Sequence, residues 1–302
     1  MHMSWRRIPT FALFISALFT SASATFAAAV PGIPAQTERL TYNIMVGGLH
    51  LGDALIVLNQ SNAGYATEMK VTASGVAKMV KSFRSDMRGE GRFTAGGTTQ
   101  PGIYIRQWAT DEVASEMTMT FDPATGTANS EERYFHPTTA APIAREDLPW
   151  NRDDRDEQPR PEVPPDMRTN AFDPMAAFVA ARGQIMAQGV TAGPKSFRVA
   201  IFDGRRRYDI VGRAEAARDV TINGTTRNVL PVVAKLEPVF GFGRRSQERM
   251  KDSEGKLLFT NDARFIPVQL TISNEILSGV MNLTADCSQD AAPCETFGKT
   301  AE

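Results

Sequence analysis

The sequence of 302 residues contains few of the residues on which recognisable enzyme sites are built, with two cysteines and three histidines in all. The sequence also has no large excess of positive or negative charge, because 33 basic residues balance 34 acidic ones. This balance argues against the basic surface of nucleic-acid-binding proteins and against a polybasic membrane patch. The sequence has no G-x-S-x-G or H-E-x-x-H motif and no phosphate-binding loop. We therefore expect no nucleic-acid partner, no metal, no cofactor and no catalytic residues.

Only two histidines, His50 and His136, lie beyond the first 29 residues, and each is in or beside a segment with β character. A zinc site or a Ser-His-Asp arrangement could form only if the fold brought distant partners to one of them. Without a supporting motif, ordinary surface or packing roles are favoured.

The first 29 residues have the pattern of a cleaved secretory signal peptide. Arg6 and Arg7 precede an apolar run over residues 8–19, and small residues with the Ala-x-Ala pattern follow at 22–24 and 27–29. The run is shorter than the roughly 18 residues that a membrane span requires. We expect export to the periplasm, no transmembrane segment after cleavage and, because no cysteine lies near the cleavage region, no lipid anchor.

The two cysteines, Cys287 and Cys294, lie together in a tail over residues 287–302. In an oxidising compartment, an even pair at this spacing predicts a disulfide. A metal site would need further ligands, and the tail has no histidine. A redox site would favour the shorter C-x-x-C spacing.

Apolar residues alternate with other residues along much of the chain, as at Leu40, Tyr42, Ile44 and Val46. Period-two alternation predicts half-buried strands. We expect about a dozen strands, divided between an N-terminal β half (38–136) and a C-terminal β half (195–286). The predicted strands are at 40–46, 54–58, 65–71, 102–108, 115–121, 133–135, 197–201, 208–211, 230–236, 256–259, 265–272 and 280–283.

Turn residues and charges mark the connections. The dipeptides Asp203-Gly204 and Asn223-Gly224 predict hairpin turns, the first of type I′. Arg205–Arg207 and Arg244–Arg245 are interpreted as solubilising hairpins and protecting strand edges. Residues 137–171 contain seven prolines among many charges. We expect this segment to be an extended or disordered connector that runs over the surface.

One helix is predicted over residues 173–188, with Asp173 as N-cap, Pro174 at the first helical position and Gly189 just past the end. One face carries an apolar stripe, with Arg182 in its middle. Three arrangements would offset the cost of burying a charge there: an ion pair with an Asp or Glu, snorkelling to water, or an anionic ligand. When Arg182 is considered alone, the ion pair is favoured. The stripe consists of Met175, Phe178, Val179, Ile185 and Met186.

Four segments together resemble a family of exported Gram-negative proteins catalogued as domain of unknown function 3108. They are Tyr42–Gly52, Asp173-Pro174 leading to Arg182, Phe202–Arg206 and Ala263–Val268. The resemblance implies a curved, barrel-like β sheet with a helix. It implies no reaction and carries over no catalytic residues. The cysteine pair and residues 137–171 look less typical of the family, which leaves their roles open.

Taken together, the sequence predicts a single mainly β domain over residues 30–302. It is a curved, partly closed antiparallel β barrel, or two β-sheet halves, with one packed central helix. The leading hypothesis is a non-catalytic periplasmic binding or envelope-maintenance protein that holds a lipid-like or other amphiphilic ligand. Arg182 would contact an anionic head group, with Phe178 and Met186 beside it. One alternative is an interaction scaffold that offers a strand edge to envelope proteins. Another is a hydrolase whose residues converge only in the fold.

Overall fold

The computed structural model describes residues 36–78, 82–149, 161–187, 195–222, 224–251, 253–273, 278–290, 294 and 297. The predicted signal peptide, residues 1–29, lies outside the described residues.

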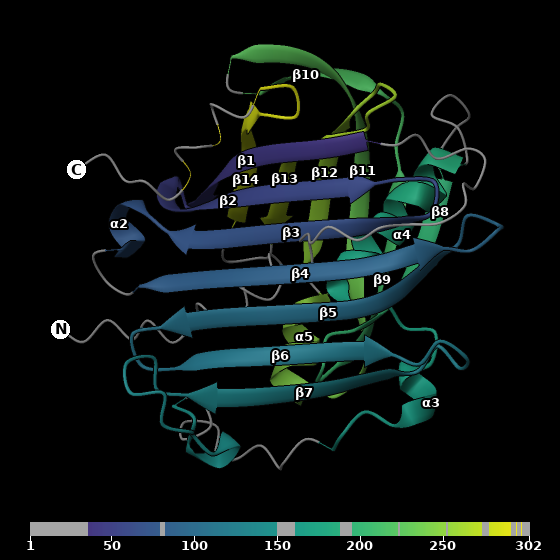
Figure 1. Cartoon of the computed structure of the whole chain (residues 1–302). Helices are drawn as coiled ribbons and strands as arrows, with labels where there is room; N and C mark the ends of the chain where they lie inside the picture. Colours follow the sequence, from purple (N-terminus) through teal and green to yellow (C-terminus); the bar gives the residue numbers. More distant parts are fainter. Residues whose placement is uncertain are drawn as a thin grey trace.

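The described strands form one antiparallel sheet of 14 strands, in the spatial order β7-β6-β5-β4-β3-β2-β1-β14-β13-β12-β11-β9-β8, with β10 paired to β11 (Figure 1). The strands of the first half are β1 (Gln36–Val46), β2 (Leu49–Gln60), β3 (Gly64–Ala73), β4 (Phe83–Phe93), β5 (Thr99–Thr110), β6 (Ala114–Phe121) and β7 (Ala128–Phe135). Those of the second half are β8 (Lys195–Phe202), β9 (Arg207–Ala214), β10 (Arg218–Ile222), β11 (Thr225–Phe240), β12 (Glu254–Thr260), β13 (Pro267–Ser273) and β14 (Ser278–Asp286).

The two halves join where the first and last strands pair, for example at Ile44 and Met281. As a result β7 and β8, which are consecutive in the sequence, form the two edges of the sheet. The sheet curves so that these edges approach each other at one end, where Ser130 Oγ on β7 donates to the carbonyl oxygen of Gly204 in the loop after β8, 3.2 Å away. The sheet is thus nearly closed into a barrel, which confirms the predicted fold class.

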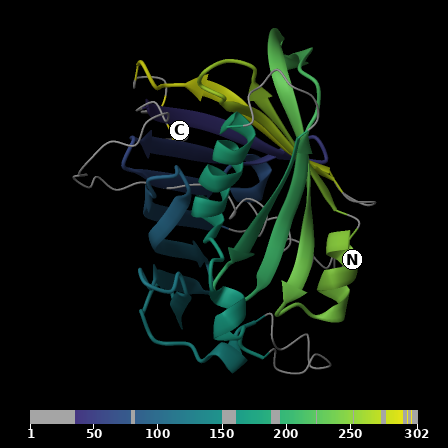
Figure 2. The ribbon, with the colours of Figure 1, turned by 90° about the vertical axis from the view of Figure 1, so that its right-hand side faces the viewer.

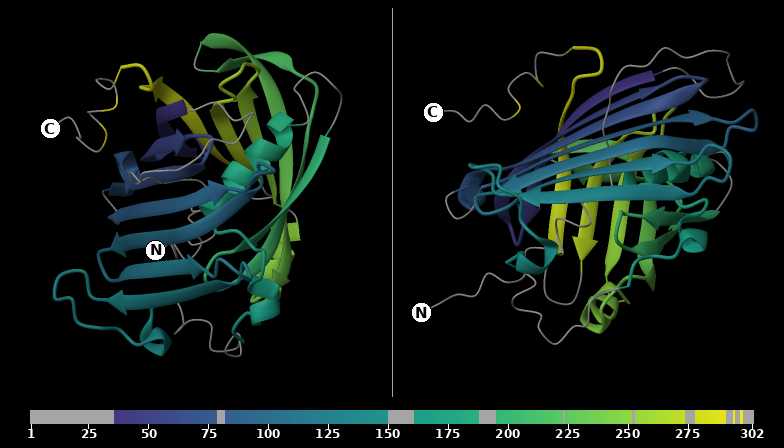
Figure 3. Two further views of the ribbon diagram at one scale, coloured as in Figure 1. Left: turned by 45° about the vertical axis from the view of Figure 1, so that its right-hand side comes forward. Right: turned by 60° about the horizontal axis from the view of Figure 1, so that its bottom comes forward.

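Helix α4 (Pro174–Ala187) lies inside this barrel, between the two halves of the sheet (Figure 2). On one side the ring of Phe178 stacks on Phe259 of β12, with 6.2 Å between centroids. On the other side, Ala176 and Val179 belong to a cluster with Leu58, Tyr65 and Phe93. The helix is therefore buried on both sides, and its alanines let it fit in the limited space between the two sheet faces. Figure 3 shows the halves facing each other across this interior.

The described part of residues 137–171 packs against the sheet at several points, which the sequence did not predict. It includes helices η1 (Arg145–Asp147) and α3 (Pro165–Arg168). Leu148, Val163 and Ala171 are buried. The segment also forms bridges to the sheet, where Pro142 pairs with Phe135 and Thr169 with Thr127. These apolar residues anchor the chain as it passes from the β7 edge toward α4, whereas most other described residues of the segment are exposed, as expected of a connector that runs over the surface.

The turn at Asp203-Gly204 differs from the predicted type I′ hairpin. Because Phe202 pairs with Arg207, the loop spans residues 203–206. The carboxylate Oδ1 of Asp203 accepts hydrogen bonds from the backbone N–H groups of Arg205 and Arg206, at 2.9 and 2.8 Å. This capping by the aspartate stabilises a longer loop than the dipeptide alone indicates. Between β10 and β11, Ile222 pairs with Thr225, as the second predicted hairpin requires.

The two basic runs also differ from their interpretation as edge protection. Arg244–Arg245 begins helix α5 (Arg244–Lys251) instead of lying on a strand. Of the first run, Arg207 donates to Asp209, whereas the guanidinium of Arg206 lies over the ring of Phe242, 5.3 Å from its centroid. Arg205 turns toward β7 and is considered below. Helix α2 (Gly75–Lys78) completes the described elements.

Candidate functional site

A cavity of about 80 Å³ lies between α4 and the concave face of the C-terminal half of the sheet, and it is partly open. The helix contributes one wall and strands β8, β9, β11, β12 and β13 the other. Apart from Arg182, Lys235 and the hydroxyl of Tyr208, the lining is apolar. The lining residues are Ala177, Phe178, Ala181, Arg182, Ile185, Phe197, Tyr208, Ile210, Val232, Ala234, Lys235, Leu236, Gly255, Leu257, Phe259 and Leu270.

The helical wall is fixed at its start by Asp173, which is fully buried. Its carboxylate Oδ1 accepts hydrogen bonds from the backbone N–H groups of Met175 and Ala176, at 2.8 and 3.0 Å. This is the N-cap that the sequence predicts. Burial raises the pKa of the Asp173 carboxyl to about 7, although these backbone hydrogen bonds lower it. Gly89 of β4 allows the close approach of the helix, since a Cβ there would lie 2.9 Å from Met175 Cβ.

Arg182, in the middle of this wall, forms a buried ion pair with Glu38 of β1. Its Nη1 and Nη2 donate to the two carboxylate oxygens, at 3.0 and 2.6 Å, and Nη2 also donates to the backbone carbonyl oxygen of Arg264. The arginine and glutamate side chains are 3% and 2% exposed. Burial raises the pKa of Glu38 by more than the attraction of Arg182 lowers it.

Arg182 lines the cavity, and its predicted contact with an anionic head group stays a prediction. Its charge is already compensated by a bidentate carboxylate, which was the alternative favoured for the residue by itself. Phe178 does line the cavity. Met186 packs, half-buried, against the same core cluster but does not line the cavity.

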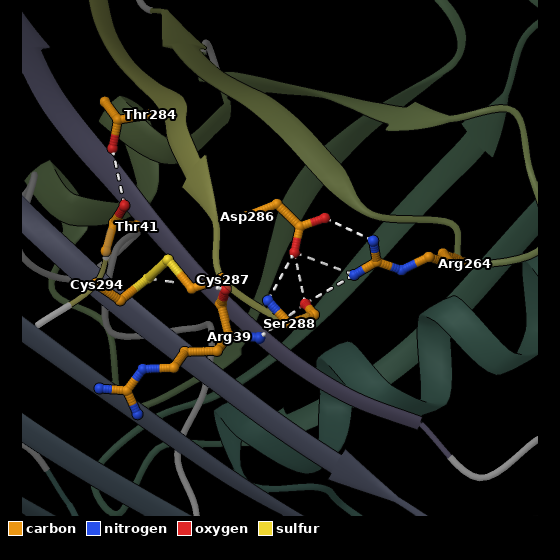
Figure 4. The surroundings of a disulfide bond; sticks show 8 residues. All are labelled: Arg39, Thr41, Arg264, Thr284, Asp286, Cys287, Ser288 and Cys294. Atoms are coloured by element: carbon orange, nitrogen blue, oxygen red, sulfur yellow. Dashed lines mark hydrogen bonds and ion pairs between the residues drawn. A yellow bond between two sulfur atoms is a disulfide. The ribbon is translucent and has the colours of Figure 1, made fainter. Parts of the chain in front are cut away.

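On the outer side of the sheet, the predicted disulfide joins Cys287 and Cys294 (Figure 4). Both cysteines cluster with Leu55 and Val57 of β2, so the tail covers apolar residues on that face. The backbone N–H of Cys287 donates to the carbonyl oxygen of Arg39, at 2.7 Å. The disulfide is thus a structural element that fixes the end of the chain to the β1–β2 region.

The same tail also reaches Arg264. The guanidinium of Arg264 donates from Nη1 to Asp286 at 2.5 Å and from Nη2 to the hydroxyl of Ser288 at 2.7 Å (Figure 4). Since the carbonyl oxygen of Arg264 accepts from Arg182, this residue connects the tail with the buried ion pair of the helix.

A second polar cluster lies where β7 meets the loop that follows β8. Glu132 of β7 accepts from Arg106 Nη2 at 2.9 Å, from Arg205 Nε at 2.7 Å and from Ser115 Oγ at 3.0 Å. We call these four residues the seam cluster. Burial raises the pKa of Glu132, but the two guanidinium groups lower it by more, so it stays below its usual value. No pattern in the sequence indicates this cluster, because its members lie on four separate segments.

The seam cluster is on the concave face of the sheet. Across β5, β6 and β7, Arg106 pairs with Met117, and Met117 pairs with Glu132. Met117 is fully buried in the same core cluster as the helix. Arg205 reaches this face because Gly204 has a φ of +93° and lies against Met117, where a Cβ would come 2.2 Å from the sulfur atom.

His50 has Asp53 and Ser74 as neighbours, but they do not form a catalytic triad. Asp53 Oδ1 and Ser74 Oγ lie 2.9 and 3.2 Å from the same ring nitrogen, Nε2. In a triad the carboxylate binds one ring nitrogen and the hydroxyl binds the other, so that a proton can be transferred. His136 contributes backbone hydrogen bonds to a turn with Ala140 and Ala141. This geometry does not support the hydrolase alternative.

The part of the chain that the structure describes has neither a metal-binding cluster nor a membrane-spanning helix. There, no group of three or more His, Cys, Asp or Glu side chains is arranged to hold a metal ion. Nor does any helix in that part have the length and apolar character needed to cross a membrane.

Comparison with known proteins places the chain in a family. No curated protein matches it. Among solved structures, it is similar to a beta-barrel-like protein of domain of unknown function DUF1849 from Brucella abortus, with 11% identity and a TM-score of 0.49 over 84% of this chain and 98% of that one. The family described as "Protein of unknown function (DUF3108)" matches residues 41–284. This match spans most of the chain and includes all four segments that carry the resemblance, so the chain belongs to the DUF3108 family.

Proposed function

We propose that the protein binds an amphiphilic molecule whose apolar end enters the cavity beside α4. The observation that carries this proposal is the lining of the cavity. Neither of its two charged residues presents a free charge to a ligand. Arg182 is paired with Glu38, and Lys235 is exposed on β11 between the inward-facing Ala234 and Leu236. An alkyl group would therefore meet mainly apolar side chains.

The size of the cavity limits how much of a ligand it can hold. An engineered apolar cavity of roughly 150 Å³ stays dry and binds benzene. A cavity of about 80 Å³ is smaller, so it accepts the end of a chain and not a whole lipid. The rest of the ligand extends through the open side. Burial contributes about 0.8 kcal/mol per methylene, so three or four methylenes supply about 3 kcal/mol.

Titration calorimetry with octan-1-ol tests the proposal, because this ligand has an apolar chain and no charge. We expect saturable binding by the wild-type protein. The variant Ala181→Leu adds an apolar side chain to the cavity wall and should weaken binding by about tenfold or more, since it fills the space the alkyl chain needs. Ala187→Leu is the matched control, because Ala187 is exposed at the end of the same helix.

Two results would contradict the proposal. One is the absence of saturable binding to the wild-type protein. The other is an equal affinity of Ala181→Leu, Ala187→Leu and the wild type, which would place any bound alcohol elsewhere.

We also propose that the protein acts in the periplasm. The basic and apolar pattern of residues 1–29 supports export, and a disulfide between Cys287 and Cys294 is compatible with an oxidising compartment. Cell fractionation and N-terminal sequencing test this directly. The processed chain should be found in the periplasmic fraction and should start after Ala24 or Ala29, whereas an unprocessed cytoplasmic chain would contradict export.

A further inference from the structure

The seam cluster holds more positive than negative charge. Arg106 and Arg205 share the single carboxylate of Glu132, and the three side chains are 16%, 27% and 11% exposed. The neighbouring loop adds Arg206 and Asp203, whose charges cancel. The excess of one guanidinium is therefore not compensated by these acidic groups. A charge removed from water in this way favours an anionic partner.

Hydrogen-bond donors also remain unused at the same place. Within the described residues, the Nε of Arg106 and the hydroxyl of Tyr104 are buried without a hydrogen-bond partner. Tyr104 is fully buried and lies two residues before Arg106 on the concave face of β5. The side-chain hydrogen bond of Arg205 uses Nε, which leaves its two Nη groups for another acceptor. Buried donors without acceptors are unusual in folded proteins and indicate a place for a ligand oxygen or a water molecule.

Aromatic contacts connect the seam cluster with the cavity. Tyr208, which lines the cavity, packs edge-on against Phe242 with 6.1 Å between centroids. The guanidinium of Arg206, next to Arg205, lies over the other ring of this pair, Phe242. Burial raises the pKa of Tyr208 well above its usual value; Asp203 and Tyr104 raise it further, whereas Arg206 and Arg106 lower it. Through Tyr208, Phe242 and Arg206, the cavity wall is therefore connected to the loop that carries Arg205.

We propose that the seam cluster binds the anionic head group, a carboxylate or a phosphate, of the ligand whose apolar end lies in the cavity. This inference rests on the proposed function and adds the charge class of the ligand. Charge-assisted hydrogen bonds from Arg106 and Arg205 would hold the head group, and Tyr104 would donate a further one. The anion-binding role predicted for Arg182, which has the carboxylate of Glu38 as its partner, is thereby assigned to two arginines that share one carboxylate.

Calorimetry with octanoate, octan-1-ol and acetate separates the two proposals. Octanoate and octan-1-ol have chains of equal length and differ in the head group, and acetate supplies the carboxylate almost without a chain. We expect octanoate to bind the wild-type protein about tenfold or more tightly than octan-1-ol, as hydrogen bonds to a charged group would provide. Acetate should bind far more weakly than octanoate.

Three variants assign the difference to the seam cluster. Arg205→Gln should remove the advantage of octanoate and leave the affinity for octan-1-ol within about twofold. Glu132→Gln removes the competing carboxylate, so octanoate should bind more tightly to it, whereas a purely structural role of the ion pair predicts weaker binding of both ligands. Arg198→Gln is the control, because Arg198 is an exposed arginine of β8 that also forms ion pairs. Circular dichroism confirms that each variant is folded.

The outcomes are distinguishable. If octan-1-ol binds and octanoate binds no better, the head-group site is wrong while the cavity proposal stands. If Arg205→Gln and Arg198→Gln have the same effect, or if acetate binds as tightly as octanoate, the connection between the seam cluster and the cavity is overturned. If neither eight-carbon ligand binds, the proposed function itself fails.

Discussion

Glu38 on β1 and Arg182 on α4 form a bidentate ion pair although 144 residues separate them in the sequence. The pair connects the helix with the strand at which the two halves of the sheet join. Because Arg182 also donates to the carbonyl oxygen of Arg264, the helix is tied to both β1 and the loop before β13. The position of one cavity wall therefore depends on this pair.

Removing one partner should be strongly destabilising. Glu38→Gln leaves the guanidinium of Arg182 buried without its counter-charge, and we expect the free energy of unfolding to fall by about 3–5 kcal/mol. Urea denaturation measures the change. Arg198→Gln breaks exposed ion pairs on β8 and should lower the unfolding free energy by about 1 kcal/mol at most.

The double variant Glu38→Leu/Arg182→Met provides an internal check on this explanation. Replacing both charges with apolar groups removes the uncompensated charge, so the double variant should be more stable than Glu38→Gln. A double variant less stable than the single one would show that packing, and not charge burial, dominates at this position.

Much of the fold could be predicted from local patterns, and the failures have physical reasons. Alternation and turn residues located twelve of the strands, and capping residues located the helix. Strand β4 was missed because its inward positions include Ser85, Gly89 and Gly91, which give no apolar alternation. Small residues are needed there because α4 and Tyr65 come close to the strand. A Cβ on Gly89 would collide with Met175 of α4, and a Cβ on Gly91 would collide with the hydroxyl of Tyr65. The requirement comes from tertiary packing, which the sequence of the strand does not display.

The partners in the site were harder to predict than the elements. Glu38 has the same parity as Leu40, Tyr42 and Ile44, so extending the predicted strand by two residues would have placed it inside. Likewise, Glu132 shares its face with Tyr134. Which arginine each carboxylate meets depends on how the barrel closes. The basic run at Arg205 is interpreted from the sequence as a solvated hairpin. Period-two alternation indicates which way strand residues point, but it gives no direction for the side chains of a loop.

Asp173 should make stability depend on pH in a direction unusual for an acidic residue. Its pKa is raised to about 7 in the folded protein, above the ordinary value of 3.8, so the folded state binds the proton more tightly than the unfolded state. Its contribution to stability is therefore fully present below about pH 4 and is lost as the pH rises to about 7. The loss amounts to at most about 4 kcal/mol.

The isosteric variant Asp173→Asn isolates this effect, since asparagine also caps helices but does not titrate. Urea denaturation between pH 4 and pH 8 should show a smaller decrease in unfolding free energy for the variant than for the wild type. Parallel curves for the two proteins would mean that Asp173 has an ordinary pKa.

The disulfide should stabilise the protein moderately. It closes a short loop, because the sequence separation of Cys287 and Cys294 is 7. For a loop of this length, the loss of chain entropy in the unfolded state corresponds to about 2 kcal/mol. Urea denaturation with and without a reductant measures the difference. The variant Cys287→Ser/Cys294→Ser should be insensitive to the reductant, and an equal response of both proteins would assign the effect to something other than the disulfide.

Gly204 should be far less tolerant of substitution than Gly224, which also has a positive φ. Gly204 and Gly224 have φ values of +93° and +77°, so Gly204→Ala and Gly224→Ala both place a side chain in the left-handed region, at about 1–2 kcal/mol. Only at Gly204 would the new Cβ meet another atom, the sulfur of Met117 at 2.2 Å, whereas nothing lies within 4 Å at Gly224. Gly204→Ala must therefore also displace the loop that carries Arg205 to Glu132, and urea denaturation should show a loss of unfolding free energy at least about 1 kcal/mol larger than for Gly224→Ala. Equal losses would contradict this expectation. They would mean that the loop can shift to make room for the new Cβ while Arg205 keeps its ion pair with Glu132.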